Sequence, residues 1–148
     1  MDATGIAATD LEVEITETLL MENMEETRTV LEQLKALGMS IAIDDFGTGY
    51  CSLGYLQDLP IDVLKVDRSF VQRIGSSRDD AEIVAAVIAM ALKLRMTVVA
   101  EGIESEGQLK FLRDNHCDFG QSYLLGKPAP GEAFATRIPM LSRSSIGP

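Results

Sequence analysis

Hydrophobic and polar residues alternate along this chain with two periods, one of two residues and one of three to four. The stretch 11–15, Leu-Glu-Val-Glu-Ile, alternates strictly and is typical of a β-strand with one polar and one apolar face. Short apolar stretches predict four further strands, at residues 40–44, 61–66, 97–100 and 118–124. Helical periodicity fills most of the intervals, so the pattern predicts strands that alternate with helices.

The first predicted helix follows the first strand. Asn23 with Glu26 three residues later resembles a capping pair, and Gly38 is a typical C-terminal stop. Between them, four apolar residues form a stripe at helical spacing: Val30, Leu31, Leu34 and Leu37. We expect this stripe to be the buried side of the helix.

Two more helices are indicated in the second half of the chain. Asp79 and Asp80 place negative charge at the start of a helix that continues to about residue 94. Its residues 81–92 are apolar nearly all round, which predicts a helix that is well covered. Ser105 with Gln108 predicts the capped start of a last helix, which ends near residue 114.

Strands separated by helices imply parallel pairing through right-handed crossovers. An open doubly wound sheet and a (β/α) barrel both satisfy that requirement. Four predicted strands carry a charged residue at the C-terminal end: Glu14, Asp44, Lys65 and Glu101. Consecutive strands that converge on one pocket favour the barrel. The predicted fold class is therefore α/β, with about five parallel strands and intervening helices. We expect the domain to occupy residues 1–138 and residues 139–148, which are small and polar, to be a tail or linker.

Composition narrows the functional classes. The chain has 148 residues, 46% hydrophobic and 24% charged, which is enough for one domain with a sizeable core. Its 13 basic and 23 acidic residues give a net charge of −10, which argues against binding to duplex nucleic acid. A small anionic ligand is compatible with this charge if metal ions separate it from the carboxylates. The longest strongly apolar run, residues 83–92, is about half as long as a membrane span. Cys51 and Cys117 have no metal-site spacing and indicate a reducing, cytosolic setting.

The charged strand ends are the candidate chemical site. Asp44 and Asp45 are adjacent, directly before Phe-Gly-Thr-Gly, and taken alone they are compatible with a simple Asx turn. Together with Glu14 and Glu101 they would repel one another unless cations were bound. Oxygen ligands suit Mg²⁺ or Mn²⁺, and adjacent aspartates can bridge two such ions for phosphodiester cleavage. Lys65 in that pocket could orient the attacking water. From the residues alone, an Asx turn at Asp44 and Asp45 and a metal site at the strand ends both remain possible interpretations.

Five segments in this order resemble a known family: LEVEITE at 11–17, DDFGTGY at 44–50, LKVD at 64–67, VAEGIE at 99–104, and QSYL at 121–124, followed by Lys-Pro. The resemblance is to the EAL domain family, bacterial phosphodiesterases specific for cyclic di-GMP and built on a modified (β/α)₈ barrel. It covers about residues 11–130. The intervals of 30, 21, 36 and 20 residues that separate Glu14, Asp44, Lys65, Glu101 and Gln121 are also similar to those of the family.

The resemblance implies a role for each site residue. Four residues match the family's metal ligands for Mg²⁺ or Mn²⁺: Glu14, Asp44, Asp45 and Glu101. Lys65 matches the lysine that positions the catalytic water, which makes Lys65 and Glu101 the expected catalytic residues. Gln121 matches a glutamine of the same pocket. Glu17 matches the glutamate that anchors the glycine-rich loop 46–53. The implied reaction is hydrolysis of one phosphodiester bond of cyclic di-GMP, which yields the linear dinucleotide pGpG.

Two family features are missing from this sequence: the Glu-Ala-Leu motif of an early strand and an asparagine ligand on the next strand. A complete barrel also needs roughly 250 residues. We therefore expect the chain to be the C-terminal part of the barrel, and weak or inactive as a phosphodiesterase by itself. The alternative is a non-catalytic module that binds cyclic di-GMP or a partner protein in second-messenger signalling. A different metal-dependent barrel enzyme, such as a lyase, is a third hypothesis, against which the DDFGTGY segment argues.

The expected partners follow from the resemblance and from the interrupted barrel. Cyclic di-GMP is the expected ligand, in the bacterial cytoplasm, within a parent protein that carries sensory or diguanylate cyclase domains. A barrel with missing strands has two unpaired sheet edges, and exposed edges pair readily with another chain. We therefore expect a homo-oligomer whose contact uses these edges.

Overall fold

A single parallel sheet organises the molecule. The computed structural model describes residues 5–47 and 53–130, and the expected tail at 139–148 lies outside these ranges. The strands are β1 (Glu12–Thr16), β2 (Ser40–Phe46), β3 (Val63–Val66), β4 (Thr97–Glu101) and β5 (Phe119–Gln121). Every strand pairs in parallel with the next one along the chain, so the spatial order is β1-β2-β3-β4-β5. A doubly wound sheet reverses its strand order at a switch point. The observed order has no such point, which confirms the predicted part of a (β/α)₈ barrel.

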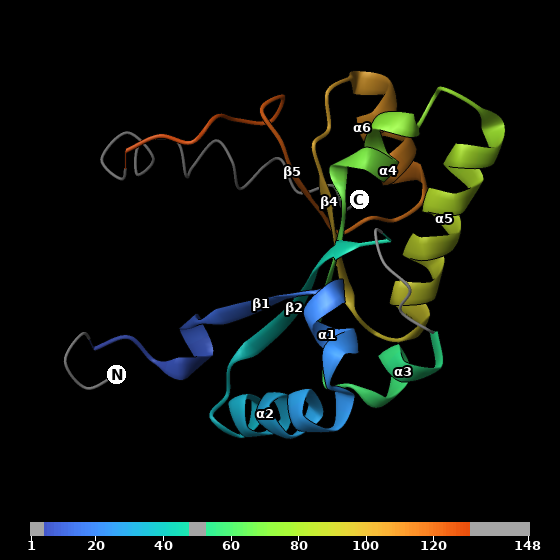
Figure 1. The fold of residues 1–148 in the computed structure, drawn as a ribbon. Coiled ribbons are helices and arrows are strands. Elements are labelled where there is room, and N and C mark those ends of the chain that lie inside the picture. Colours follow the sequence, from blue (N-terminus) through green and yellow to red (C-terminus); the bar gives the residue numbers. More distant parts are fainter. Residues whose placement is uncertain (1–4, 48–52, 131–148) are drawn as a thin grey trace.

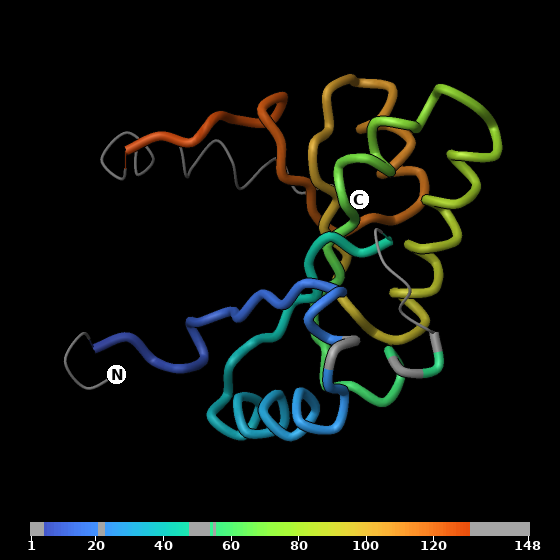
Figure 2. The backbone as a smooth tube through the Cα atoms, in the orientation of Figure 1, coloured from blue at the N-terminus to red at the C-terminus, as the bar shows by residue number. Residues whose placement is uncertain are grey.

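The helices are α1 (Glu17–Glu22), α2 (Met24–Ala36), α3 (Leu53–Asp58), α4 (Arg68–Arg73), α5 (Arg78–Lys93) and α6 (Glu106–Asp114), after a short 3₁₀ turn, η1 (Ala8–Asp10). In Figure 1, α4, α5 and α6 lie to the right of the strands and α2 lies below them. The tube view shows the segment after β5 leading away to the left (Figure 2). Within the ranges that the structure describes, no helix is long and apolar enough to cross a bilayer.

Three of these helices were not predicted from the sequence. Helices α1, α3 and α4 have six residues each, which is less than two turns. So short a segment cannot show a repeated apolar stripe, which explains why periodicity missed them. Helices α1 and α4 directly follow β1 and β3, so both begin beside the C-terminal ends of the strands, where the charged residues lie.

The longer helices lie where the sequence predicts them but are less covered than expected. Leu31 of α2 is buried, whereas Val30 of α2 and Leu37, which follows the helix, are exposed. The buried side of this helix therefore does not include all four residues of the predicted stripe. In α5, Val84 and Ile88 are buried on one side while Ile83 is exposed, so the prediction of a well-covered helix is wrong. Each helix packs on the sheet through one face, and its opposite face is left to solvent.

Two local predictions had different outcomes. The Ser105–Gln108 capping box at α6 is confirmed in both directions, side chain to backbone. At α2, Asn23 occupies the N-cap position, but its side chain accepts no backbone hydrogen bond. Its amide Nδ2 instead donates to Glu26 Oε2 at 2.6 Å. The pair therefore forms, but it does not cap the helix.

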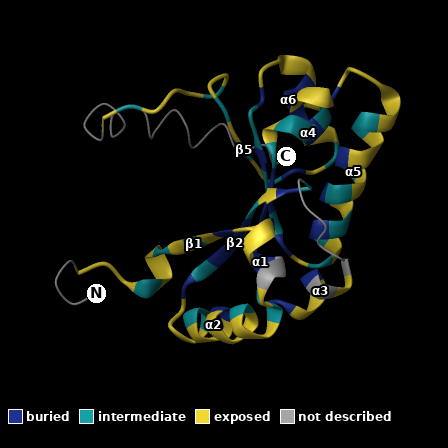
Figure 3. Ribbon diagram, viewed as in Figure 1, coloured by how far each residue is buried: buried dark blue, intermediate teal, exposed yellow. Residues whose placement is uncertain are grey.

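The core lies between the middle of the sheet and the helices. All four residues of β3 are buried, whereas β1 and β5, which form the two sides of the sheet, are largely exposed (Figure 3). Strand β5 is also shorter than the predicted 118–124, because the chain turns after Gln121. Ser122 starts this turn, where its carbonyl oxygen accepts from the Gly126 amide at 3.0 Å.

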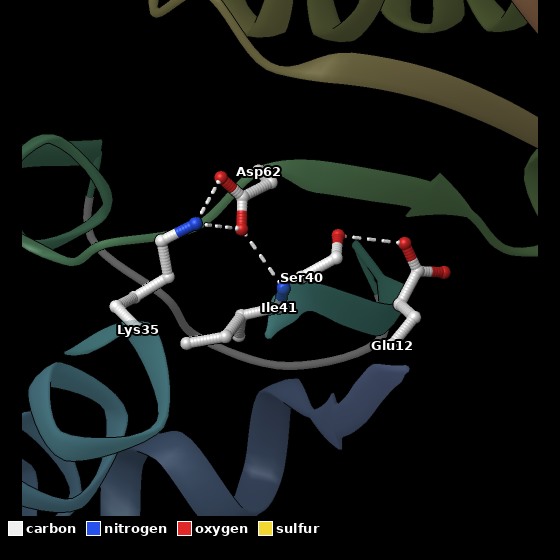
Figure 4. Close-up of polar contacts among 5 residues, drawn as sticks. All are labelled: Glu12, Lys35, Ser40, Ile41 and Asp62. Atoms are coloured by element: carbon white, nitrogen blue, oxygen red, sulfur yellow. Dashed lines mark hydrogen bonds and ion pairs between the residues drawn. The ribbon is translucent and has the colours of Figure 1, made fainter. Parts of the chain in front are cut away.

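At the N-terminal ends of the strands, Asp62 links three elements (Figure 4). Its two carboxylate oxygens accept from Lys35 Nζ at the end of α2, at 2.7 and 2.8 Å, and Oδ2 also accepts from the Ile41 amide of β2 at 2.8 Å. Asp118 repeats the device before β5, where Oδ2 accepts from the Val98 amide of β4 at 2.8 Å. Each of these aspartates thus accepts a hydrogen bond from a backbone amide near the start of the neighbouring strand.

Candidate active site

Lys65 is the centre of the charged cluster at the C-terminal ends of the strands. Its ammonium Nζ lies 2.9 Å from Glu14 Oε1 of β1, 3.0 Å from Asp44 Oδ1 of β2 and 3.0 Å from Glu101 Oε1 of β4. Lys65 itself belongs to β3, so four neighbouring strands contribute one charged side chain each. The structure thus brings together the four strand-end charges that the sequence analysis singled out.

The cluster is shielded most strongly at its centre. The Lys65 side chain is 8% exposed, and those of Asp44 and Glu101 are 25% and 22% exposed. Burial disfavours the charged lysine, but the attraction of the Glu14, Glu101 and Asp44 carboxylates outweighs it and raises the Lys65 pKa above its ordinary range. Lys65 is therefore a fixed cation at neutral pH. It can donate hydrogen bonds and offset negative charge, but it cannot accept a proton.

The carboxylates around Lys65 offer the donor set of a hard metal ion. Among the described residues, Asp44 Oδ1 is buried and accepts no well-aligned hydrogen bond, although the Lys65 ammonium lies 3.0 Å away. Such an oxygen is suited to a cation, and all-oxygen sites suit Mg²⁺, Mn²⁺ or Ca²⁺. In residues 5–47 and 53–130, no group of three or more acidic, histidine or cysteine side chains is already arranged to hold a metal ion. The residues fit a metal ion in their chemistry, and binding would require the carboxylates to turn from Lys65 toward it.

A bulge in β2 changes the direction of the paired aspartates. Successive residues of a regular strand point to opposite faces, so Asp44 and Asp45 could not both face one pocket. The register between β2 and β3 shifts between Ile43 and Phe46, and Asp45 has a positive φ of 53°. An extra residue of this kind re-aims side chains, as bulges beside active sites commonly do. The bulge thus releases Asp45 from the alternation of the strand.

Glu17 connects α1 to the segment that follows Asp45. Its side chain is almost fully buried, and Oε2 accepts a hydrogen bond from the Gly47 amide at 2.9 Å. Gly47 has a φ of 102°, and a Cβ there would lie 2.6 Å from the Phe70 ring, so only glycine fits. The rest of the predicted loop 46–53 lies mostly outside the described residues.

Gln121 lies at the end of β5, beside Glu101 of β4 in the sheet register. The Gly102 amide donates to the Gln121 carbonyl at 2.9 Å, which joins the two strand ends. A groove of about 950 Å³ opens here, lined by Glu101 and Gln121 together with Arg68, Glu104, Tyr123 and Lys127, among others. This volume is in the range of small-molecule sites. Gln121 therefore borders the groove rather than the Lys65 cluster itself.

Sequence reasoning missed Arg68, the first residue of α4. Asp67 caps this helix, because its Oδ1 accepts from the Ser69 amide at 2.9 Å. Partial burial opposes ionisation of Asp67, but these hydrogen bonds from Ser69 hold its pKa below the ordinary value. The Asp-Arg-Ser sequence directly after the third strand was the available signal, since Asp is a preferred N-cap residue.

Fold and site together define a class. A parallel α/β barrel segment whose strand ends converge on carboxylates and one lysine, beside a groove, is typical of barrel enzymes that act on small molecules at this face. The sequence matches the EAL domain family over residues 1–128. The chain belongs to the EAL domain family.

Individual relatives agree with this assignment. The chain is 55% identical over 130 residues to cyclic di-GMP phosphodiesterase NbdA of Pseudomonas aeruginosa, covering 88% of this chain but 17% of NbdA. It resembles the solved PaMucR phosphodiesterase in complex with cyclic di-GMP, with 43% identity, a TM-score of 0.83, and coverage of 87% of this chain and 52% of that one. It also resembles Klebsiella pneumoniae BlrP1, solved with cyclic di-GMP and manganese or calcium, with 35% identity, a TM-score of 0.80, and coverage of 86% and 32%. The chain thus spans about a sixth of NbdA and about half of the PaMucR chain.

Proposed function

We propose that this chain forms part of the active site of a phosphodiesterase that hydrolyses cyclic di-GMP to linear pGpG. The observation that carries the proposal is the Lys65 cluster, in which four consecutive strands bring three carboxylates within 3.0 Å of one ammonium. The related NbdA is a cyclic di-GMP phosphodiesterase, and PaMucR was solved with this ligand. In the reaction, a water oxygen forms a bond to phosphorus and one P–O bond to the ribose breaks, which opens the ring.

Glu14, Asp44, Asp45 and Glu101 are the residues that would hold Mg²⁺ or Mn²⁺. When bound, such ions polarise phosphate oxygens and lower the pKa of water. The manganese complex of the related BlrP1 supports a divalent ion at this site. The buried Asp44 Oδ1, which accepts no well-aligned hydrogen bond within the described ranges, supports it independently.

The chain's own residues position the reactants. Lys65 donates hydrogen bonds that orient the attacking water, and its charge offsets that of the phosphate. Glu17 holds the Gly47 amide and thereby the segment that carries Asp45. Gln121 borders the groove that receives the nucleotide. We expect the parent protein to act in the bacterial cytoplasm, together with sensory or diguanylate cyclase domains.

The second candidate is a cyclic di-GMP-binding module without catalysis. The observation that favours it is the openness of the described sheet, in which β1 and β5 each have only one neighbour. A site bounded on one side by solvent holds its ions and substrate loosely, and a misplacement of about 1 Å can cost on the order of 10²-fold in rate. We therefore expect slow or undetectable hydrolysis by this chain alone.

Two measurements test the proposed function. Calorimetry with cyclic di-GMP and Ca²⁺ should show binding to the 148-residue chain, and its absence would refute both candidates. In a hybrid in which this chain replaces the corresponding half of the PaMucR phosphodiesterase, Mn²⁺ should support formation of pGpG. In that hybrid, Lys65→Ala should lower the turnover number because the attacking water loses the group that orients it. Glu17→Ala should also lower the turnover number, because the segment after Asp45 loses its hydrogen bond at the Gly47 amide. A hybrid that is folded and binds the ligand but never cleaves it would leave the binding module as the function.

A further inference from the structure

The groove beside Glu101 extends away from the Lys65 cluster, and its far part contains charges that the proposed hydrolysis does not use. Arg68 of α4, Glu104 after β4, and Lys127 after β5 all line it. Arg68 is exposed and makes no ion pair with any other residue that the structure describes, whereas Lys65 is paired with three carboxylates. Its guanidinium is therefore available to a ligand.

The backbone brings Arg68 unusually close to the end of β4. Gly102, directly after Glu101, has a φ of 68°, and a Cβ there would lie 2.5 Å from Arg68 Cβ and 3.3 Å from Arg68 Cα. Any other residue at Gly102 would displace the start of α4. The Asp67 cap holds the same helix start through the Ser69 amide. Arg68 is thus held against Gly102, the residue that follows the proposed metal ligand Glu101.

The groove also offers an acceptor and an aromatic surface. Gln72, one turn along α4 from Arg68, donates from Nε2 to Glu104 Oε1 at 2.8 Å and so fixes that carboxylate at the groove wall. Tyr123 is 73% exposed, and Lys127 Nζ lies 5.9 Å from the centroid of its ring. A planar ligand with acceptors on one edge and donors on another would match this set, and an exposed ring is a platform for stacking a base.

Guanine has that arrangement. Its O6 and N7 accept a bidentate pair of hydrogen bonds from arginine, whereas adenine presents a donor, N6, in the place of O6. Carboxylates accept from the N1 and N2 donors of guanine, which adenine lacks. We propose that Arg68, supported by Gly102, reads one guanine base of the substrate in this groove, and that it is a specificity residue rather than a catalytic one. The assignment rests on the proposed function, because it takes cyclic di-GMP as the ligand.

The test is calorimetry on the full 148-residue chain with Ca²⁺, using cyclic di-GMP and its adenine analogue cyclic di-AMP. The wild-type chain should prefer cyclic di-GMP. Arg68→Gln should weaken binding of cyclic di-GMP roughly 10- to 100-fold and leave cyclic di-AMP nearly unchanged, which removes the preference. Arg68→Lys should restore little of the affinity for cyclic di-GMP, since an ammonium cannot make the bidentate pair of hydrogen bonds. The matched control is Arg113→Gln, an exposed arginine of α6 outside the groove lining, which should bind like the wild type.

Each remaining outcome has a definite meaning. Arg68→Gln could instead weaken the affinity for both dinucleotides equally, with the affinity restored in Arg68→Lys. That result would show that Arg68 pairs with a phosphate and would overturn the guanine assignment. Unchanged affinity in Arg68→Gln would overturn it as well, while leaving the proposed function intact. No cyclic di-GMP binding by the wild-type chain would overturn the proposed function and this assignment together. Because Arg68 is exposed, its variants should keep the wild-type melting temperature, which circular dichroism checks.

Discussion

Individual residues at the strand ends are held by charge rather than by packing. Lys65 is buried only because three carboxylates compensate its charge, and removing one partner of a buried ionic cluster commonly costs several kcal/mol. The same carboxylates face a lysine now and would face metal ions in the proposed enzyme. Binding of a metal ion at the proposed site would therefore compete with Lys65 for the same oxygens.

The first prediction concerns Asp44, whose Oδ1 is buried beside Lys65. Asp44→Asn removes one negative charge from the proposed metal site, so Mn²⁺ affinity measured by calorimetry should fall at least about 10-fold, because hard ions prefer charged oxygen ligands. Glu32→Gln, an exposed carboxylate of α2 that pairs with Arg28, is the control and should not change the isotherm. Indistinguishable isotherms for Asp44→Asn and the wild type would remove the metal-site assignment.

The second prediction concerns Cys117. Its thiol is buried, with Sγ 3.3 Å from the Phe119 carbonyl, and burial raises its pKa to about 11. In a Cys51→Ser background, native Cys117 should react with iodoacetamide at pH 8 at least about 100-fold more slowly than in guanidinium chloride, because the thiolate is the reactive form. Mass spectrometry follows the labelling, and similar rates in both conditions would contradict the prediction.

The pH dependence of stability at Cys117 has a definite sign. The folded-state pKa lies above the ordinary thiol value of 9.0, so the folded state holds the proton more tightly. This contribution to the free energy of unfolding is present below pH 9 and is lost as the pH rises toward about 11.

Among elements, the two ends of the strands have different tasks. The C-terminal ends carry the charged cluster, whereas the N-terminal ends carry Asp62 and Asp118, which tie neighbouring strands together. In barrel enzymes the first face holds the site and the second supports stability. The hydrogen bonds of Asp62 and Asp118 between neighbouring strands indicate that the N-terminal ends have a stabilising role here as well.

The third prediction tests that division at Asp62. Asp62→Ala leaves the Ile41 amide and Lys35 without their partner, so urea unfolding should show a loss of about 1–3 kcal/mol. Asp62→Asn, which keeps an acceptor for Ile41, should lose less. Glu32→Ala, which breaks an exposed pair within α2, should cost under about 0.5 kcal/mol. Cyclic di-GMP affinity should be unchanged in folded Asp62→Asn, and a weakened affinity would contradict the division of tasks.

At the scale of the whole molecule, the sheet formed by residues 5–47 and 53–130 ends in two strands, β1 and β5, that each pair with one neighbour among these residues. Strand β1 is exposed along most of its length, and Phe119 in β5 is 53% exposed. Unpaired backbone groups and wet apolar surface both favour association with another strand. The edges therefore determine the expected oligomeric state.

The fourth prediction is a dimer or larger assembly that forms through these edges. Light scattering at micromolar concentration should give a mass above that of one chain, and Phe119→Lys should shift it to the monomer, because lysine on an edge strand opposes pairing. Ile83→Lys on the exposed face of α5 is the comparison. Dissociation by Ile83→Lys alone would place the contact on the helix instead, and a folded wild-type monomer would refute the assembly.

Much of this molecule could be predicted from local sequence patterns. Alternation at 11–15 predicted β1, and the Ser105–Gln108 box predicted the start of α6, because strand pleating and helix capping depend on residues within a few positions. The charges at four strand ends favoured the barrel over the doubly wound sheet, and the sequential parallel order β1-β2-β3-β4-β5 confirms that fold class. The charged strand ends were singled out from the sequence pattern, and the resemblance to the EAL family implied their roles and added Glu17.

Tertiary structure decided what depends on distant residues. The exposure of Val30 and Ile83 follows from how far the sheet extends beneath α2 and α5, which periodicity does not record. The bulge at Asp45 arises from the pairing of β2 with β3, and it interrupts the strand alternation that would put adjacent aspartates on opposite faces. The approach of Arg68 to Gly102 joins residues 34 positions apart through the β3–β4 pair. Local sequence thus determined which elements form and which charges end them, whereas the contacts between strands determined where those charges meet.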